Sequence, residues 1–256
     1  MKKNALKAKL QTGTYATGVV FTEEAPAMVE IAAFLGFDFA FIDCEGTAIA
    51  PHTVGRMVMA AECRGMTSLV RVLPGAGPVA TALNTGAGGV IIPEVNTARM
   101  AEELVAHAKY SPAGKRGIAG ARAADYGFGG AAAEYTRTAN EETLLVACIE
   151  SREGVANAEA ILSVPGLDGV FLGVNDLALD MGLPGEVKHP RVLEAAVRVA
   201  AIAREKGKFA GSIVAGGQAP ADIMAQGFNV VFSSLPGLFA AASKAFLASC
   251  AGAGKY

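Results

Sequence analysis

Eight short apolar runs rich in β-branched residues recur along the chain and alternate with segments of helical periodicity. Such runs are typical of buried strands, and several of the segments between them end at a glycine, as helix C-termini prefer. The runs occupy residues 15–21, 38–43, 67–72, 89–93, 144–150, 169–173, 208–214 and 229–233. Eight strands alternating with helices predict an α/β protein, a (β/α)8 TIM barrel in one domain that spans residues 1–256. An open doubly wound sheet is the alternative, because strand order cannot be read from one sequence.

The composition excludes several classes of partner. With 52% hydrophobic residues and 31 glycines, the chain resembles a soluble α/β enzyme. Its formal net charge of -2, with acids and bases interspersed, leaves no basic stripe, so we expect no nucleic-acid partner. No apolar stretch reaches the length of a membrane span and no signal peptide is visible, so we expect no membrane partner and a cytoplasmic location. The four cysteines show neither C-x-x-C pairing nor zinc-ligand spacing, and we expect them to stay reduced.

Two carboxylates follow successive predicted strands within residues 144–182. Glu150 ends the run LLVACIE, and Asp176 follows the run GVFLG. Parallel strands joined by a helix bring their C-terminal ends to one face, so we expect the two acids to lie close together and to hold a divalent metal. Carboxylate ligands with open positions favour Mg²⁺ or Mn²⁺, with Co²⁺ or Zn²⁺ as alternatives. The competing interpretation is structural, with Glu150 capping the next helix or pairing with Arg152.

Arg71 lies in the third predicted strand and is expected at the same face. Its planar guanidinium would bind the carboxylate of a small oxo acid beside the metal. The competing interpretation is a salt bridge at the barrel rim, to Asp43 or to Glu45.

Two further segments break the regular alternation. Residues 110–143 form a long, glycine-rich connection after the fourth strand, which we interpret as an active-site loop on the same face as the two acids. The last helical segment, LPGLFAAASKAFLASCAG, has more apolar faces than its own barrel can cover, so we expect it to lie on a neighbouring subunit.

Several segments lie in the order and spacing of one known family. They are FDFAFIDCEG, LVRV, YSPAGKRGIAGARAADYG, residues 148–182 and KHP. Over essentially its whole length the chain resembles the HpcH/HpaI aldolases, metal-dependent class II pyruvate aldolases of the phosphoenolpyruvate/pyruvate barrel superfamily. The resemblance implies a homo-oligomer, a trimer or hexamer, whose C-terminal helix is exchanged between subunits and whose site is completed by a neighbour. It also implies a small 2-keto acid as substrate.

The resemblance assigns roles to matching residues. In that family the acids that match Glu150 and Asp176 bind the divalent metal, and the arginine that matches Arg71 polarises and orients the pyruvate oxygens. Backbone amides of one turn hold the pyruvate carboxylate, and the matching residues here are Gly173, Val174 and Asn175. Many relatives carry a glutamine directly before the metal-binding Ile-Glu pair, where the present chain has Cys148, and we expect Cys148 to be a substrate-binding residue.

The chain departs from the family pattern at the proton-transfer residues. In typical relatives a histidine follows the acid after strand two and is supported by an aspartate before strand four. This chain has Gly46 and Asn84 at these places. A metal-bound water or a phosphate-like anion can replace the histidine as the base, and Glu45 and His52 are the candidate catalytic side chains. His52 is equally consistent with a place beside the N-cap of the next helix.

These observations predict a metal-dependent carbon-carbon lyase. We expect reversible aldol cleavage of a 4-hydroxy-2-keto acid to pyruvate and an aldehyde or ketone, through an enolate stabilised by the metal and by Arg71. Oxaloacetate decarboxylation and a citrate-synthase-like condensation are the first alternative, since neither needs the missing histidine. The second alternative is a barrel that binds metal and keto acid without turnover.

Overall fold

The computed structural model describes residues 3–215 and 217–251. Eight parallel strands form a closed barrel in sequence order, and β8 returns to pair with β1. The strands are β1 Ala16–Phe21, β2 Phe39–Asp43, β3 Thr67–Arg71, β4 Gly89–Ile92, β5 Leu144–Ile149, β6 Gly169–Leu172, β7 Phe209–Ile213 and β8 Val230–Ser234. The closed barrel confirms the predicted (β/α)8 fold and excludes the open doubly wound sheet.

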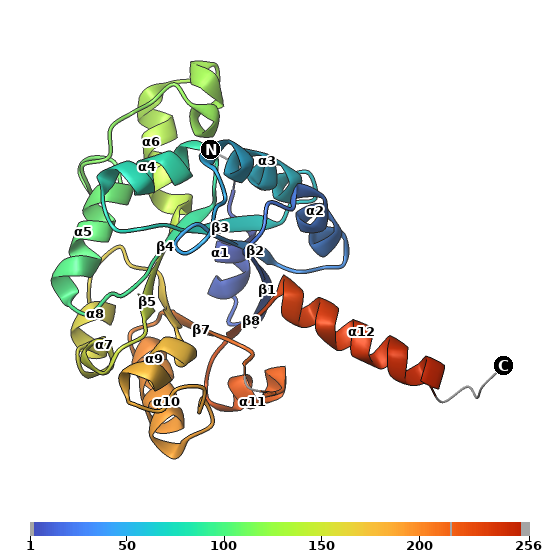
Figure 1. Ribbon diagram of the computed structural model, residues 1–256. Coiled ribbons are helices and arrows are strands. Elements are labelled where there is room, and N and C mark those ends of the chain that lie inside the picture. The colour runs from blue at the N-terminus through green and yellow to red at the C-terminus, as the bar shows by residue number, and fades with distance from the viewer. Residues whose placement is uncertain (1–2, 216, 252–256) are drawn as a thin grey trace.

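Helices surround the barrel, as Figure 1 shows for α2 to α5 and α7 to α11. The helices are α1 Ala5–Gln11, α2 Pro26–Phe34, α3 Pro51–Glu62, α4 Ala76–Asn84, α5 Ala98–Ala108, α6 Ala132–Glu142, α7 Arg152–Ala156, α8 Ala158–Leu162, α9 Val174–Asp180, α10 Pro190–Glu205, α11 Pro220–Ala225 and α12 Leu235–Ala251, with a 3-10 helix η1 Arg122–Gly127. Their apolar faces pack on the outside of the strands and form the larger of two hydrophobic clusters.

Aromatic rings fill the inside of the barrel. Phe171 of β6 lies within 4.8 to 6.1 Å, centre to centre, of four other phenylalanine rings that point inward from β2, β7 and β8. Glycines in the strands leave room for these rings, since a methyl group added at Gly18 would lie 2.3 Å from the ring of Phe39. A methyl group at Gly211 would likewise lie 2.6 Å from the ring of Phe171. The barrel is therefore solid below its mouth, and a ligand must bind at the strand ends.

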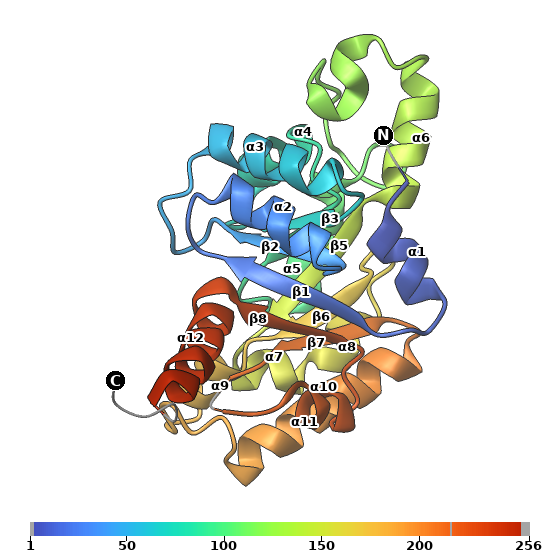
Figure 2. The ribbon, with the colours of Figure 1, turned by 90° about the vertical axis from the view of Figure 1, so that its right-hand side faces the viewer.

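Residues 110–143 lie at the N-terminal end of the barrel, so their predicted place as a loop over the C-terminal face of their own barrel is wrong. Helix α5 follows β4 and carries the chain back to the N-terminal end before residue 110, which is why the segment begins there. The segment contains η1 and the eleven-residue helix α6, and Figure 2 shows α6 beside the N-terminal helix α1. Arg122 of η1 pairs with Glu62 at the C-terminal end of α3, which fixes the segment to that end.

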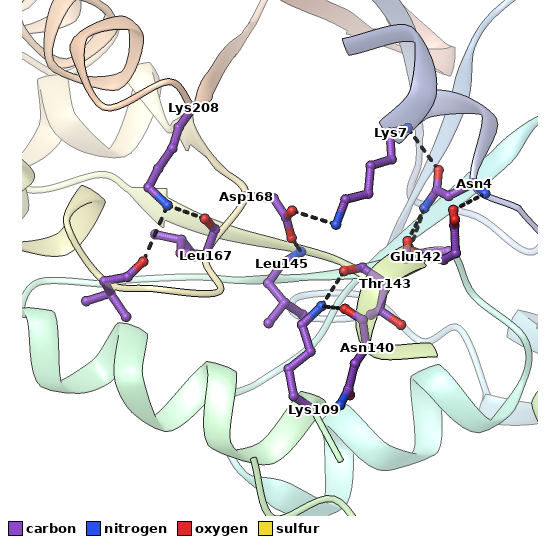
Figure 3. A network of polar contacts seen from close by, with 12 residues as sticks. Asn4, Lys7, Lys109, Asn140, Glu142, Thr143, Leu145, Leu167, Asp168 and Lys208 are labelled. Atoms are coloured by element: carbon purple, nitrogen blue, oxygen red, sulfur yellow. Dashed lines mark hydrogen bonds and ion pairs between the residues drawn. The ribbon is translucent and has the colours of Figure 1, made fainter. Parts of the chain in front are cut away.

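A buried polar network fixes the end of this segment (Figure 3). The Lys109 ammonium donates to the carbonyl oxygens of Asn140 and Thr143, at 2.7 and 2.8 Å. The Asn4 side chain donates to the carbonyl oxygen of Glu142 at 2.9 Å. Burial lowers the pKa of Lys109 to about 8, because no carboxylate contacts the ammonium directly to offset its lost hydration among the described residues.

Helix α12 leaves the barrel and extends outward, as Figure 1 shows. Phe239, Phe246 and Leu247 are 65 to 72% exposed, so the helix covers little of its apolar surface on its own barrel. Within the described ranges, no helix is both long and apolar enough to cross a membrane.

Candidate active site

Asp43 and Arg71 lie side by side at the carboxyl ends of neighbouring strands, because the register of β2 and β3 pairs these two residues. The Asp43 carboxylate accepts two hydrogen bonds from the guanidinium, from Nε at 2.9 Å and from Nη2 at 2.7 Å. The guanidinium also lies 5.5 Å from the ring centre of Phe41, inside the barrel. A two-point contact and an aromatic face fix the plane of Arg71 at the barrel mouth.

Glu45 binds the same guanidinium, with 3.0 Å between its Oε2 and Nη1 of Arg71. Its backbone N–H donates to Oδ1 of Asp43 at 3.2 Å, and the Thr47 hydroxyl donates to the Asp43 carbonyl oxygen, so this turn is closed by its own hydrogen bonds. The rim salt bridge considered from the sequence is therefore present, to both acids. An arginine has five N–H donors, so the contacts of the described chain leave one N–H on each terminal nitrogen of Arg71 for a ligand.

Glu150 is a buried carboxylate at the carboxyl end of β5, with 7% exposure. Its Oε1 accepts the backbone N–H of Glu94 at 2.6 Å, and its Oε2 accepts the thiol of Cys148 at 3.3 Å. Glu94 has a φ of 51°, a left-handed conformation that costs a residue other than glycine about 1–3 kcal/mol. In the described part of the chain, no lysine or arginine forms an ion pair with Glu150.

The barrel mouth holds more negative than positive charge. Burial raises the pKa of Glu45; Arg71 opposes the rise, while Glu150, Asp43 and Glu94 add to it. Burial disfavours the charge of Arg71, but the hydrogen bonds to Asp43 and then the charge of Glu45 raise its pKa above the ordinary value, so it stays cationic. Among the described residues, the Arg71 guanidinium is the cationic group that these acids contact or influence, and the surplus of negative charge favours a further cation.

The turn after β6 lies against Glu150. A methyl group added at Gly173 would lie 2.5 Å from Oε2 of Glu150, so the backbone passes directly beside this carboxylate. Val174 is buried, while Asn175 and Asp176 are exposed in the first turn of α9. The structure therefore places the predicted pyruvate turn and both acids at the same end of paired strands, although no hydrogen bond within the described residues joins Glu150 to Asp176.

The remaining predicted residues lie apart from this group. His52 is an exposed residue in the first turn of α3, close to Glu24, whose pKa is lowered mainly by hydrogen bonds from neighbouring residues and to a smaller extent by His52. Asn84 is the last residue of α4 and accepts a hydrogen bond from Arg116 at 3.0 Å. A helix that follows a strand returns the chain to the N-terminal end of the barrel. Asn84 ends α4 and therefore lies at the N-terminal end, whereas Gly46 follows β2 and lies at the C-terminal end.

The chain matches the HpcH/HpaI aldolase/citrate lyase family over residues 17–234, from the first strand to the last. The chain belongs to this family. It is 37% identical to the hydroxypyruvate/pyruvate aldolase of Sagittula stellata over 196 residues, and the matched segment covers 75% of this chain and 76% of the relative. It is 33% identical over 243 residues to the 2-keto-3-deoxy-L-rhamnonate aldolase of Klebsiella pneumoniae, which covers 89% of this chain and 85% of the relative. The chain is accordingly an enzyme of the lyase class.

Solved structures of the HpcH/HpaI fold superpose closely on this barrel. Citrate synthase SbnG does so with a TM-score of 0.86 and 27% identity, over 98% of both chains. A more distant structure is the citrate lyase β subunit of M. tuberculosis complexed with oxaloacetate and magnesium. It shares the fold at 16% identity, with a TM-score of 0.60 over 90% of this chain and 95% of the other.

The donor set of this HpcH/HpaI site fits a divalent cation. Glu150 is buried without a cationic partner, and in residues 3–215 and 217–251 the exposed Asp176 carboxylate makes no hydrogen bond or ion pair. No three histidine, cysteine, aspartate or glutamate side chains converge in these ranges to form a metal site alone. Mg²⁺ commonly binds through one or two carboxylates and completes its shell with substrate and water. Glu150 and Asp176 could thus be the protein ligands of such an ion.

Sequence reasoning missed the part that Glu94 plays at this HpcH/HpaI site. Its backbone N–H, rather than its side chain, fixes the Glu150 carboxylate. No pattern of residue types reveals this contact, because it depends on a left-handed backbone at a residue that rarely adopts it.

Proposed function

We propose that this chain catalyses the reversible, metal-dependent aldol cleavage of a 4-hydroxy-2-keto acid to pyruvate and an aldehyde or ketone. The observation that carries the proposal is the buried Glu150 carboxylate, which has no cationic partner in the described chain and lies at the barrel mouth with Arg71. The names of the two aldolase relatives support the reaction class and a keto acid as the substrate. The magnesium named for the distant citrate lyase β subunit supports Mg²⁺, with Mn²⁺ as its usual substitute.

Each residue of the site has a part in this proposal. A divalent cation held by Glu150 and Asp176 would supply Lewis-acid polarisation of the keto acid. Arg71 donates its two remaining N–H groups to the substrate oxygen on which negative charge develops as the carbon-carbon bond breaks. The backbone amides of the turn after β6 bind the substrate carboxylate, and the turn comprises Gly173, Val174 and Asn175.

Cys148 supports Glu150 in this proposal and does not act as a nucleophile. Burial, and then the charge of Glu150, raise the pKa of the Cys148 thiol well above its ordinary value. The thiol therefore stays protonated and continues to donate its hydrogen bond to Oε2 of Glu150.

A second candidate function is decarboxylation of oxaloacetate or a citrate-synthase-like condensation. Gly46 favours it, because these reactions do not require the histidine that this position lacks, and so does the close superposition on citrate synthase SbnG. Both candidates use the same metal ligands and the same arginine, so the substrate rather than the site separates them.

We also propose that the whole chain forms one barrel domain and assembles in the cytoplasm as a homotrimer or homohexamer through exchange of α12. The exposed Phe239, Phe246 and Leu247 support this assembly, because α12 leaves an apolar surface of a kind that a second subunit commonly covers.

Turnover by the metal-stripped and reloaded enzyme tests the function. We expect pyruvate from 4-hydroxy-2-keto acids with Mg²⁺ or Mn²⁺, and we expect Glu150→Gln and Asp176→Asn to abolish it. A glutamine can still accept the Glu94 N–H, so Glu150→Gln removes the charge and keeps the local fold. The control is Glu103→Gln, the same change in an exposed ion pair of α5. Full metal-dependent activity in Glu150→Gln would refute the metal site.

A further inference from the structure

The proposed cleavage needs a group that takes a proton from the 4-hydroxyl and later returns one to carbon 3 of the pyruvate enolate. Gly46 has no side chain to do this, and a Cβ added at Gly46 would meet no atom within 4 Å. The place of the usual histidine is therefore open space beside the barrel mouth. A side chain that reaches this open space can take the place of the histidine.

Geometry separates the candidate groups. His52 lies on the exposed first turn of α3, and within the described residues it forms no hydrogen bond or ion pair with the cluster around Arg71. Burial and the charge of Asp43 raise the pKa of Cys44 to about 11, and the buried Cys148 thiol already donates its proton in a hydrogen bond to Oε2 of Glu150. A protonated thiol cannot accept a proton, so neither cysteine qualifies.

Glu45 precedes the open position directly and is held in place by its neighbours. The turn from Asp43 to Thr47 is closed by two hydrogen bonds, and Oε2 of Glu45 lies 3.0 Å from Nη1 of Arg71. Its side chain is 27% exposed, so it reaches both the site and solvent. Nη1 of Arg71 has a second N–H, which is free to bind a substrate oxygen. The Glu45 carboxylate and the bound substrate oxygen would then lie on the same nitrogen and close to each other.

We propose that Glu45 is the acid-base catalyst of this enzyme, an assignment that rests on the aldol cleavage proposed above. The ionised carboxylate takes the proton of the 4-hydroxyl, the C3–C4 bond breaks, and the aldehyde or ketone leaves while its electron pair becomes the enolate. Glu45 then gives the same proton to carbon 3, which yields pyruvate and restores the carboxylate. No proton is gained or lost over the cycle, and no other reactant is needed.

The charges around Glu45 suit a proton that arrives and leaves again. Burial, with Glu150, Asp43 and Glu94, raises the pKa of Glu45 and so favours uptake of the proton. Arg71 stabilises the ionised carboxylate and so favours release to the enolate.

Two reactions on the same enzyme test the assignment. Aldol cleavage requires loss of a hydroxyl proton, whereas oxaloacetate loses CO₂ and has no such proton, although both need Arg71 and the metal. In Glu45→Gln, kcat/KM for cleavage of the best 4-hydroxy-2-keto acid should fall by about 10²- to 10⁴-fold, the usual contribution of a general base. Oxaloacetate decarboxylation should stay within about threefold of the wild type, because its enolate can be protonated by water. Glu103→Gln is the matched control and should keep both activities.

Three results would overturn the assignment and leave the proposed lyase reaction in place. Cleavage by Glu45→Gln within threefold of the wild type would remove Glu45 from the proton transfer. An equal loss of both activities would make Glu45 a positioning residue that acts through Arg71. A loss of cleavage alone in His52→Ala, at the level expected for Glu45→Gln, would move the role to His52. A wild-type enzyme with neither activity would instead refute the proposed lyase reaction, and this assignment with it.

Discussion

The contact between Gly173 and Glu150 makes a single added methyl group a sharp test of the site. In Gly173→Ala the new Cβ would lie 2.5 Å from Oε2 and 2.7 Å from Cβ of Glu150. The backbone at Gly173 has φ -82° and ψ 81°, which alanine also adopts, so the substitution adds no backbone strain. The carboxylate oxygen must therefore recede by about 0.9 Å to reach an ordinary contact of 3.4 Å.

Two independent arguments give the same size of effect. Moving Glu150 weakens the 2.6 Å hydrogen bond from the Glu94 N–H, and a bond to a charged group contributes about 1.5–3 kcal/mol. A displacement of about 1 Å at a catalytic group costs about 10²-fold in rate, which corresponds to about 2.7 kcal/mol. We expect Gly173→Ala to lower metal-dependent kcat/KM by about 10²-fold and to weaken Mn²⁺ binding.

Steady-state pyruvate formation and a calorimetric Mn²⁺ titration measure these effects. Gly55→Ala is the matched control, because a methyl group at Gly55 meets no atom within 4 Å and lies within α3. It should keep full activity and gain about 1 kcal/mol of stability from the better helix former. If Gly173→Ala keeps wild-type kcat/KM and Mn²⁺ affinity, the close contact between Gly173 and Glu150 is not needed to position Glu150 for metal binding and catalysis.

Two further predictions concern the open position beside Glu45 and the buried lysine. Gly46→His, added to Glu45→Gln, should restore cleavage by at least about tenfold, because the site has room for an imidazole; an unchanged kcat/KM would contradict this. The unfolded chain keeps the Lys109 proton up to about pH 10.5 and the folded chain only to about 8, so the free energy of unfolding should rise between these values, by up to about 3 kcal/mol. Urea unfolding across this range should show a larger rise in the wild type than in Lys109→Met; parallel curves would refute it.

Local patterns were sufficient to predict the elements of the fold. All eight predicted strands are present, and their bounds differ by one residue at most at either end, because buried parallel strands read as continuous apolar runs bounded by turns. Closure of the sheet was decided only in three dimensions, since the pairing of β8 with β1 joins residues more than 200 positions apart.

The placement of residues 110–143 shows where local reading fails. The segment follows the fourth strand in the sequence, but α5 intervenes and returns the chain to the N-terminal end. A loop that follows a helix lies at the N-terminal end of the barrel, and a loop that follows a strand lies at its C-terminal end. The place of a loop therefore depends on the element directly before it rather than on the nearest strand in the sequence.

The sequence by itself determined the eight strands, the family and the identities of Glu150, Asp176 and Arg71 as candidate site residues, because each acid follows a strand and Arg71 ends one. Only the tertiary structure decided how they are held: Arg71 between Asp43 and Glu45, and Glu150 between the Glu94 N–H and Gly173. These contacts join residues from different strands and depend on backbone conformation and strand register. The types of the contacting residues predict neither the backbone conformation nor the register.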